Sequence, residues 1–394
     1  MINFQFCVPT RVVFGKDTQK NVGAEIVSEG GKKVLLHYGS ERIKKDGLYD
    51  EVMASLKNAN LEVFELGGVR PNPRIDTVRK GVEICKAQGI DFILAVGGGS
   101  PIDSSKAIAI GALMEGDIWN DIYLGGGAAP TKALPIGVIL TFAAAGSETS
   151  NSVVISSEDG SIKRGLRCNA IRPRFALENP ELTYSLPPYQ TGAGTADILM
   201  HILDRYFTNE KNTEVTDRLA EGAMKAIIRA GRQVIENPSD YNARADLMWV
   251  GGLAHNDLMG LGKVNDFAVH QLGHELSAKY DVTHGASLTI AWQHWAKYVY
   301  KHDVMQFAKF AVRVMDCQMD FENPENTALE GIKRLNDWFI ELGMPTSFDD
   351  AKLPKDELDD LAYHCTFFGK RTIGQLVTLK AEDILNIYKM MAGI

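Results

Sequence analysis

The chain has 394 residues, of which 45% are hydrophobic and 23% charged, so a packed core and room for two domains are expected. The 42 lysines and arginines against 50 aspartates and glutamates give a formal net charge of -8, and no basic run is long enough to neutralise a row of phosphates, which argues against nucleic acid as a partner. The five cysteines are far apart without a CxxC pair, and no apolar run approaches the roughly 18 residues of a membrane helix. We therefore expect a cytoplasmic protein with reduced cysteines and no membrane partner.

The first half of the chain alternates short apolar runs with amphipathic stretches, from residue 32 to about residue 186. This order is typical of parallel βαβ units, in which buried strands alternate with helices. The pattern predicts strands at 34–38, 61–66, 91–96 and 134–141, with helices at 48–59 and 74–88. Residues 153–157 and 163–169, on either side of the turn at 158–161, predict an antiparallel hairpin beside that sheet.

The pattern changes after Pro187 and Pro188, where long helical periods replace the strands through to the last residue. A proline pair is a natural boundary because neither residue donates a backbone hydrogen bond, and the residue before each proline is pushed out of helical geometry. We predict an α/β domain at residues 1–188 and an all-helical domain at 189–394.

A glycine-rich loop follows the predicted strand at 91–96. The loop contains Gly97, Gly98, Gly99 and Ser100, with Ser100 as the expected helix cap and Asp103 just inside the helix. Three glycines let the backbone approach a ligand closely, and the amide groups at a helix amino terminus suit an anion such as the pyrophosphate of a dinucleotide. The loop is neither the GxGxxG fingerprint nor a P-loop, so a tight turn without a ligand stays an alternative.

The end of the first predicted strand bears on the choice of nucleotide. Enzymes that prefer NAD often carry a carboxylate there to hold the ribose hydroxyls, whereas a small or basic neighbourhood leaves room for a 2′-phosphate. Gly39 and Ser40 occupy this place, and Arg42, Lys44 and Lys45 follow. We therefore predict NADP(H) as the cofactor. The alternative is that the three basic residues are only the solvated face of a helix.

Five potential metal ligands fall in two short segments of the helical half. Asp197 and His201 are four residues apart, as are His270 and His274, so each pair projects from one face of a helix, and His284 follows in the same run. Imidazole nitrogens and a carboxylate oxygen are ligands that iron or zinc accepts. Spacing does not decide which of the three later histidines bind, and histidines that only cap or pack are the alternative.

Four motifs in this order resemble those of one family: GGGSPIDSSKAIA, TFAAAGSETSN, NPELTYSLPPYQTGAGTADILMH and an HxxxHxxxxxxxxxH run. The chain resembles the iron-containing, or group III, alcohol dehydrogenases, and within them the NADP-dependent butanol dehydrogenase branch. The resemblance implies a dehydroquinate-synthase-like fold, with a nucleotide-binding α/β domain, an all-helical domain and the active site in the cleft between them. It also implies a divalent metal, with Fe2+ expected and Zn2+ as the alternative.

The resemblance also implies roles for single residues. The family's metal ligands fall on four positions, Asp197, His201, His270 and His284. This leaves His274 beside the ligands, either to pass a proton or to orient a ligand histidine. Thr141, Lys163 and Leu182 match nucleotide contacts, and Asn151 matches a residue of the substrate pocket. Lys163 suits a plain hairpin equally, and Leu182 a plain core.

The implied function is hydride transfer between NADP(H) and a short-chain primary alcohol or aldehyde such as butanol or butanal. One alternative is a zinc-dependent polyol dehydrogenase of the glycerol type. A more distant one is a lyase resembling dehydroquinate synthase, which would carry Glu at one ligand position and a basic cluster that VHQLGHELS lacks. The amino-terminal FQFCVPTRVVFG can pair as an edge strand with a second copy, so we expect a homodimer.

Overall fold

The computed structural model describes residues 1–394, and packing divides them into two compact units. One unit is Cys7–Ser185, and the other combines Leu186–Ile394 with Met1–Phe6. The first six residues therefore differ from the predicted division, which assigned them to the α/β domain. Local hydrogen bonds explain the difference: the amino group of Met1 donates to the Lys211 carbonyl at 3.1 Å, and the Ile2 N–H donates to the Gly262 carbonyl at 3.0 Å.

A six-stranded, all-parallel sheet forms the centre of the α/β unit, in the order β1-β8-β5-β4-β2-β3. The four predicted strands are confirmed as β2 (Lys33–Tyr38), β3 (Glu62–Leu66), β4 (Phe92–Gly97) and β5 (Ile136–Leu140). Strand β1 (Arg11–Phe14) lies in the amino-terminal segment that was predicted as an edge strand, whereas the short strand β8 (Phe175–Glu178) was not predicted. They pair with each other, Arg11 opposite Phe175, so the RVVF segment completes the sheet of its own chain at one edge.

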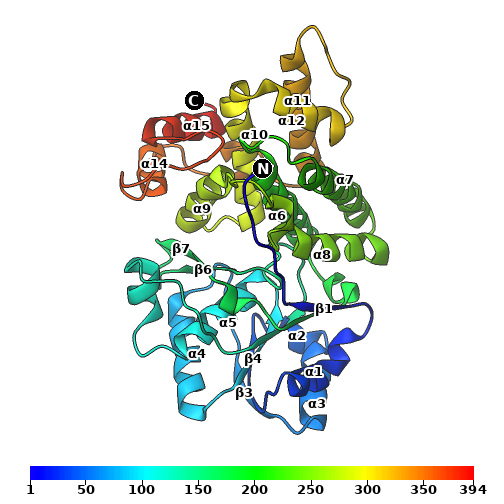
Figure 1. Ribbon diagram of the computed structural model, residues 1–394, viewed down its shortest axis with the longest axis vertical. Helices are drawn as coiled ribbons and strands as arrows, with labels where there is room; N and C mark the ends of the chain where they lie inside the picture. Colours follow the sequence, from blue (N-terminus) through cyan, green and yellow to red (C-terminus); the bar gives the residue numbers. More distant parts are fainter. The chain divides into compact units, whose positions relative to one another are not determined.

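Helices cover both faces of this sheet, as the alternation of side chains along a strand requires. One face packs against α1 (Val22–Ser28) and α3 (Leu48–Asn58), whose apolar side chains share a core with alternate residues of β2 and β4. On the other side of the strands lie α4 (Ile75–Gln88) and α5 (Gly99–Gly111), which pack on each other (Figure 1). The single-turn α2 (Arg42–Lys45) follows β2.

The predicted hairpin is also confirmed. Strands β6 (Ser152–Ser156) and β7 (Lys163–Arg167) form a separate two-stranded antiparallel sheet with Ser156 opposite Lys163. Short helical turns fill the connections of this unit at η1 (Thr18–Asn21), η2 (Trp119–Leu124), η3 (Asn169–Ile171) and η4 (Pro180–Thr183).

The second unit is helical, and α6 (Pro188–Tyr206) runs through its interior. Every residue of α6 from Thr191 to Tyr206 is buried, and the helix begins with Pro188, a residue suited to a first helical position because it needs no hydrogen bond for its nitrogen. The other elements are α7 (Glu214–Glu236), α8 (Tyr241–His255), η5 (Leu258–Gly260), α9 (Ala268–Tyr280), α10 (His284–Val299), η6 (Tyr300–His302), α11 (Val304–Arg313), α12 (Pro324–Glu341), α13 (Phe348–Ala351), α14 (Leu358–Cys365) and α15 (Ala381–Ala392).

Helices α7, α8, α9 and α10 all pack against α6. None of the helices combines the length and the apolar composition needed to cross a membrane.

Candidate metal centre and nucleotide loop

Three helices of the helical unit bring four of the predicted metal ligands together. Asp197 and His201 lie one turn apart on α6, His270 lies on α9, and His284 is the first residue of α10. The Oδ1 atom of Asp197 is 3.4 Å from Nε2 of His201 and 3.8 Å from Nε2 of both His270 and His284. The ligand atoms of Asp197, His201 and His270 all lie within 4.8 Å of one another, and His284 approaches this group through the Asp197 carboxylate.

These separations fit a shared divalent cation. Distances of 3.4 Å and 3.8 Å are too long for good hydrogen bonds. Two ligand atoms that each lie about 2.0–2.2 Å from one tetrahedral ion are roughly 3.3–3.6 Å apart, which is close to the observed distances. Asp197 Oδ1, His201 Nε2 and His270 Nε2 are buried without a hydrogen-bond partner. Burying such atoms is costly unless something binds them. The donor set, one carboxylate and three imidazoles, is the nitrogen and oxygen chemistry of iron or zinc.

Burial also prepares His201 to act as a ligand. It holds the pKa of His201 well below its ordinary value, with neighbouring histidines adding to the effect. The ring is therefore neutral, as metal coordination requires. At His270 burial likewise lowers the pKa, but Asp204 and Asp197 outweigh it and the net pKa is raised. A proton thus competes for His270 as the pH falls.

Asp204, which the sequence analysis missed, orients His270. Its carboxylate is hydrogen-bonded to Nδ1 of His270, and both side chains are buried. Such a carboxylate fixes the tautomer of a ligand histidine and turns its other nitrogen toward the metal. The signal in the sequence is a second aspartate seven residues after Asp197 in an otherwise buried helix, on nearly the same face.

Two further histidines lie beside the cluster. The His274 ring is 5.2 Å from that of His284 and 6.2 Å from that of His270, measured between ring centroids. His255, the last residue of α8 and not singled out from the sequence, stacks on His201 with ring centroids 4.1 Å apart and an interplanar angle of 21°. Both are less buried than Asp197, His201 and His270.

In the α/β unit, packing explains the glycines between β4 and α5. Gly97 has φ +154°, and a Cβ there would lie 2.6 Å from Cγ of Pro101, while a Cβ on Gly98 would lie 2.9 Å from Cβ of Phe142. The backbone therefore passes closer to its neighbours than any larger residue permits. The predicted cap was wrong: α5 begins at Gly99 with Gly98 in extended geometry as its cap, so Ser100 is already helical.

Asp103 and Lys106, on adjacent turns of α5, hold the loop that leads to β6. Asp103 accepts hydrogen bonds from the Ser147 hydroxyl at 2.5 Å and the Val154 N–H at 2.8 Å. The ammonium of Lys106, missed from the sequence, is fully buried and contacts four oxygen atoms of residues 147–152 at 2.9–3.2 Å. Burial lowers its pKa to about 8, although the Asp103 carboxylate opposes the shift. The contacts of Asp103 thus position a loop within its own unit.

Gly39 and Ser40 follow β2 directly, at the place that the sequence analysis linked to the choice between NAD and NADP. Ser40 is exposed, and its hydroxyl accepts only a weak hydrogen bond of 3.4 Å from the Arg42 N–H. Lys44 forms an ion pair with Glu41 at 3.0 Å and lies over the Tyr38 ring at 5.4 Å. Arg42 likewise forms an ion pair with Asp46 at 3.5 Å, so two of the three basic residues are held by carboxylates at the ends of their own helix, as the alternative interpretation anticipated.

The other predicted contacts are spread over the α/β unit. Thr141 follows β5, and its N–H donates to the Gly97 carbonyl at 3.0 Å, which places it beside the glycine loop. The Lys163 ammonium donates to the Asn72 side chain at 2.9 Å, and Leu182 packs against the core under α1 and α3. The side chain of Asn151 is hydrogen-bonded to Asn169 and Arg167, the latter in β7.

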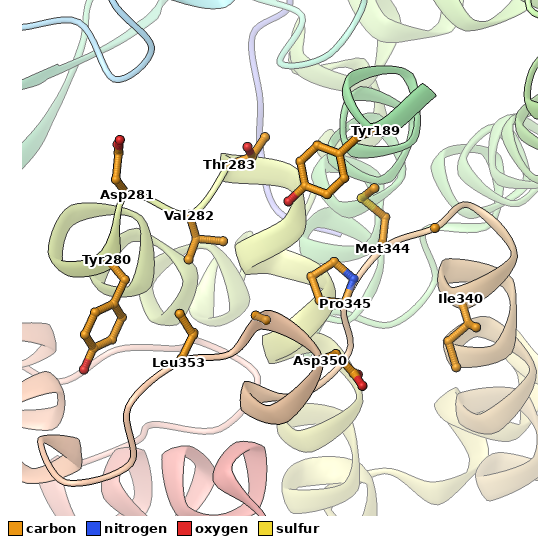
Figure 2. A pocket seen from close by; sticks show the side chains of 12 residues that line it. Tyr189, Tyr280, Asp281, Val282, Thr283, Ile340, Met344, Pro345, Asp350 and Leu353 are labelled. Carbon is orange, nitrogen blue, oxygen red and sulfur yellow. The ribbon is translucent and has the colours of Figure 1, made fainter. Parts of the chain in front are cut away.

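A cavity of 640 Å³ lies in the helical unit, as Figure 2 shows. Apolar and tyrosine side chains make up most of its wall, and Asp281 and Asp350 add acidic groups, which disfavour an anionic ligand. It reaches the ends of all three helices that carry candidate ligands, through Tyr189 in the first turn of α6, Tyr280 at the end of α9 and Thr283, the residue before His284. Its lining contains neither a histidine nor a basic residue; the members are Tyr189, Tyr280, Asp281, Val282, Thr283, Ile340, Gly343, Met344, Pro345, Asp350, Ala351 and Leu353.

Comparison with known proteins assigns both halves of the chain. Residues 9–180 match the family model described as iron-containing alcohol dehydrogenase, and residues 191–392 match the C-terminal model of the Fe-containing alcohol dehydrogenase family. The chain is 40% identical over 390 residues to NADH-dependent butanol dehydrogenase A of Clostridium acetobutylicum, covering 99% of each chain. It is 33% identical over 393 residues to the NADPH-dependent aldehyde reductase YqhD of Escherichia coli, again covering 99% of each.

Solved structures agree with these matches. The crystal structure of an NADH-dependent butanol dehydrogenase A from Thermotoga maritima superposes with a TM-score of 0.96 at 37% identity, covering 100% of this chain and 99% of the other. The parallel α/β unit and the helical unit are those of the expected dehydroquinate-synthase-like fold. The protein belongs to the iron-containing alcohol dehydrogenase family.

Proposed function

We propose that the protein interconverts short-chain primary alcohols and aldehydes, such as butanol and butanal, with NADP(H) and a divalent metal, Fe2+ in the first place. The observation that carries this proposal is the buried cluster of Asp197, His201 and His270, whose ligand atoms lie within 4.8 Å of one another, with Nε2 of His284 3.8 Å from the Asp197 carboxylate. The names of the relatives, butanol dehydrogenase and aldehyde reductase, support the substrate class.

Each group of the site has a separate task in this proposal. A bound divalent ion supplies Lewis-acid polarisation of the alcohol or carbonyl oxygen, and the dinucleotide supplies or accepts the hydride. Asp197 and the three histidines hold the ion, and Asp204 keeps the imidazole of His270 in the ligating tautomer. His274 moves the proton between the reacting oxygen and solvent, since an imidazole titrates near neutral pH and this one lies beside His284.

For the nucleotide, we propose that the glycine loop and the first turn of α5 bind the pyrophosphate, with Thr141 beside them. Ser40 supports NADP(H), because an exposed hydroxyl at the end of β2 leaves room where a carboxylate would repel a 2′-phosphate. The NADH-dependent names of the relatives with 40% and 39% identity favour NAD(H) instead, so cofactor preference is the part of the proposal to test directly.

The test is NADPH oxidation with butanal by protein stripped of metal and then reloaded with Fe2+ or Zn2+, repeated with NADH. We expect turnover only with metal, and a higher kcat/KM with NADPH. A higher kcat/KM with NADH would overturn the cofactor assignment alone. Turnover without metal would overturn the role of the cluster. Reduction of NADP+ or NAD+ by glycerol or propane-1,3-diol, without NAD(P)H oxidation by butanal, would favour a polyol dehydrogenase, an outcome that two relatives named 1,3-propanediol dehydrogenase make worth including.

A further inference from the structure

The two buried ligand histidines differ in what holds their rings. His270 is held through Nδ1 by the Asp204 carboxylate. His201 has no such partner, because both of its ring nitrogens are buried without a hydrogen bond. A ligand histidine normally donates its other N–H to a carboxylate, a carbonyl or a water, which fixes the plane of the ring. No protein group therefore fixes the plane of the His201 ring by a hydrogen bond, which leaves ring packing as the contact that orients it.

The ring of His255 is in the place to do so. Its centroid is 4.1 Å from that of His201 with the two planes 21° apart, a face-to-face contact and the closest ring pair of the cluster. His255 ends α8, and α8 packs along α6, which carries His201. The contact is therefore fixed by two packed helices and does not depend on a mobile loop.

We propose that His255 is a positioning residue of the metal centre: by stacking, it holds the His201 ring so that Nε2 faces Oδ1 of Asp197, 3.4 Å away. This inference rests on the proposed function, since it assumes that the cluster binds an ion. The role proposed for His255 is carried by the flat face of its ring, which stacks on His201. We therefore expect phenylalanine at position 255 to preserve metal binding. Asparagine keeps a polar side chain but has no ring, so it should not.

The experiment compares His255→Phe, His255→Asn and His255→Ala in the full-length protein. Each is loaded with Zn2+, and metal release is followed after addition of excess chelator. We expect release to be about 10- to 100-fold faster from the Asn and Ala variants, the range found when a partner of a ligand histidine is lost, and within about threefold of wild type for Phe. If the His255→Phe variant released metal as fast as the His255→Asn variant, the proposal would be overturned, because the ring alone would not be enough to hold His201. Wild-type release rates in all three would overturn it as well.

A spectroscopic measurement separates ring orientation from general loosening. With Co2+ in place of Zn2+, the visible absorption bands of the bound ion report the geometry of its ligands. We expect these bands to shift in the His255→Asn variant and to stay unchanged in the His255→Phe variant. Thermal unfolding of the metal-stripped proteins checks folding, and Trp249→Ala, which removes a half-exposed ring from the same helix, serves as the control. If the wild-type protein retains no metal, the proposed function fails. If the wild-type protein retains metal and the His255→Asn variant has the same release rate and spectrum, only the proposed role of His255 fails.

Discussion

Replacing Asp204 by asparagine tests whether the carboxylate behind His270 tunes the metal centre. The side chain of Asp204 is 1% exposed and is hydrogen-bonded to Nδ1 of His270, so the bond is charge-assisted and shielded from water. Asparagine has nearly the same shape and keeps an oxygen that accepts a hydrogen bond. The substitution therefore removes the negative charge while the tautomer of His270 can be preserved.

The size of the effect follows from this geometry. A hydrogen bond to a charged group contributes about 1.5–3 kcal/mol, and loss of a partner to a ligand histidine costs about 10- to 100-fold in metal affinity. The two figures agree, since tenfold corresponds to roughly 1.4 kcal/mol. We expect Asp204→Asn to weaken metal binding by about 10- to 100-fold.

The assay is competition for Zn2+ against a chromophoric chelator at pH 7, with wild type and Asp246→Asn in parallel. Asp246 forms an exposed ion pair with Arg229 on the outside of the same unit, so its loss controls for a change of charge. Thermal unfolding of the metal-stripped Asp204 variant checks that it folds. A metal affinity within about threefold of wild type, in a folded Asp204→Asn protein, would refute the reasoning about His270.

Four further substitutions probe the other parts of the molecule. Asp197→Ala removes the oxygen that all three histidines face, so metal analysis after purification should find the ion lost; full occupancy would contradict its role. His274→Ala should lower kcat by about 100-fold or more while metal content stays at the wild-type level, and loss of the metal would instead make it a ligand. Ser40→Asp should shift the ratio of kcat/KM values toward NADH by at least about tenfold through repulsion of the 2′-phosphate, and an unchanged ratio would tell against this placement. Lys106→Met should destabilise the protein by about 3–5 kcal/mol in urea unfolding, because the buried Asp103 carboxylate loses its neighbouring positive charge and four oxygen atoms lose their donor, whereas the exposed Lys80→Met should change stability by less than about 0.5 kcal/mol.

Local periodicity in the sequence was enough to place most of the elements. Strands such as β2 and β4 are buried on both faces and read as continuous apolar runs, so their position follows from the sequence alone. The four-residue spacing of Asp197 and His201 likewise follows from the pitch of a helix. The family motifs predict that His201, His270 and His284 bind the metal, and this stays a prediction that the 3.4–3.8 Å distances from their Nε2 atoms to Asp197 support.

What only the tertiary structure decided depends on residues far apart in the chain. Strand β8 is too short to stand out by itself and forms between β5 and β1, and the partner of the amino-terminal edge strand, more than 160 residues away, could not be predicted from the sequence. The sequence alone does not assign Asp204 its role, because its contact with His270 depends on the packing of α9 against α6. Likewise, His255 contacts His201 only because α8 packs along α6. A sequence determines which faces of its elements are apolar, whereas contacts between polar side chains on different elements are determined by how those faces pack.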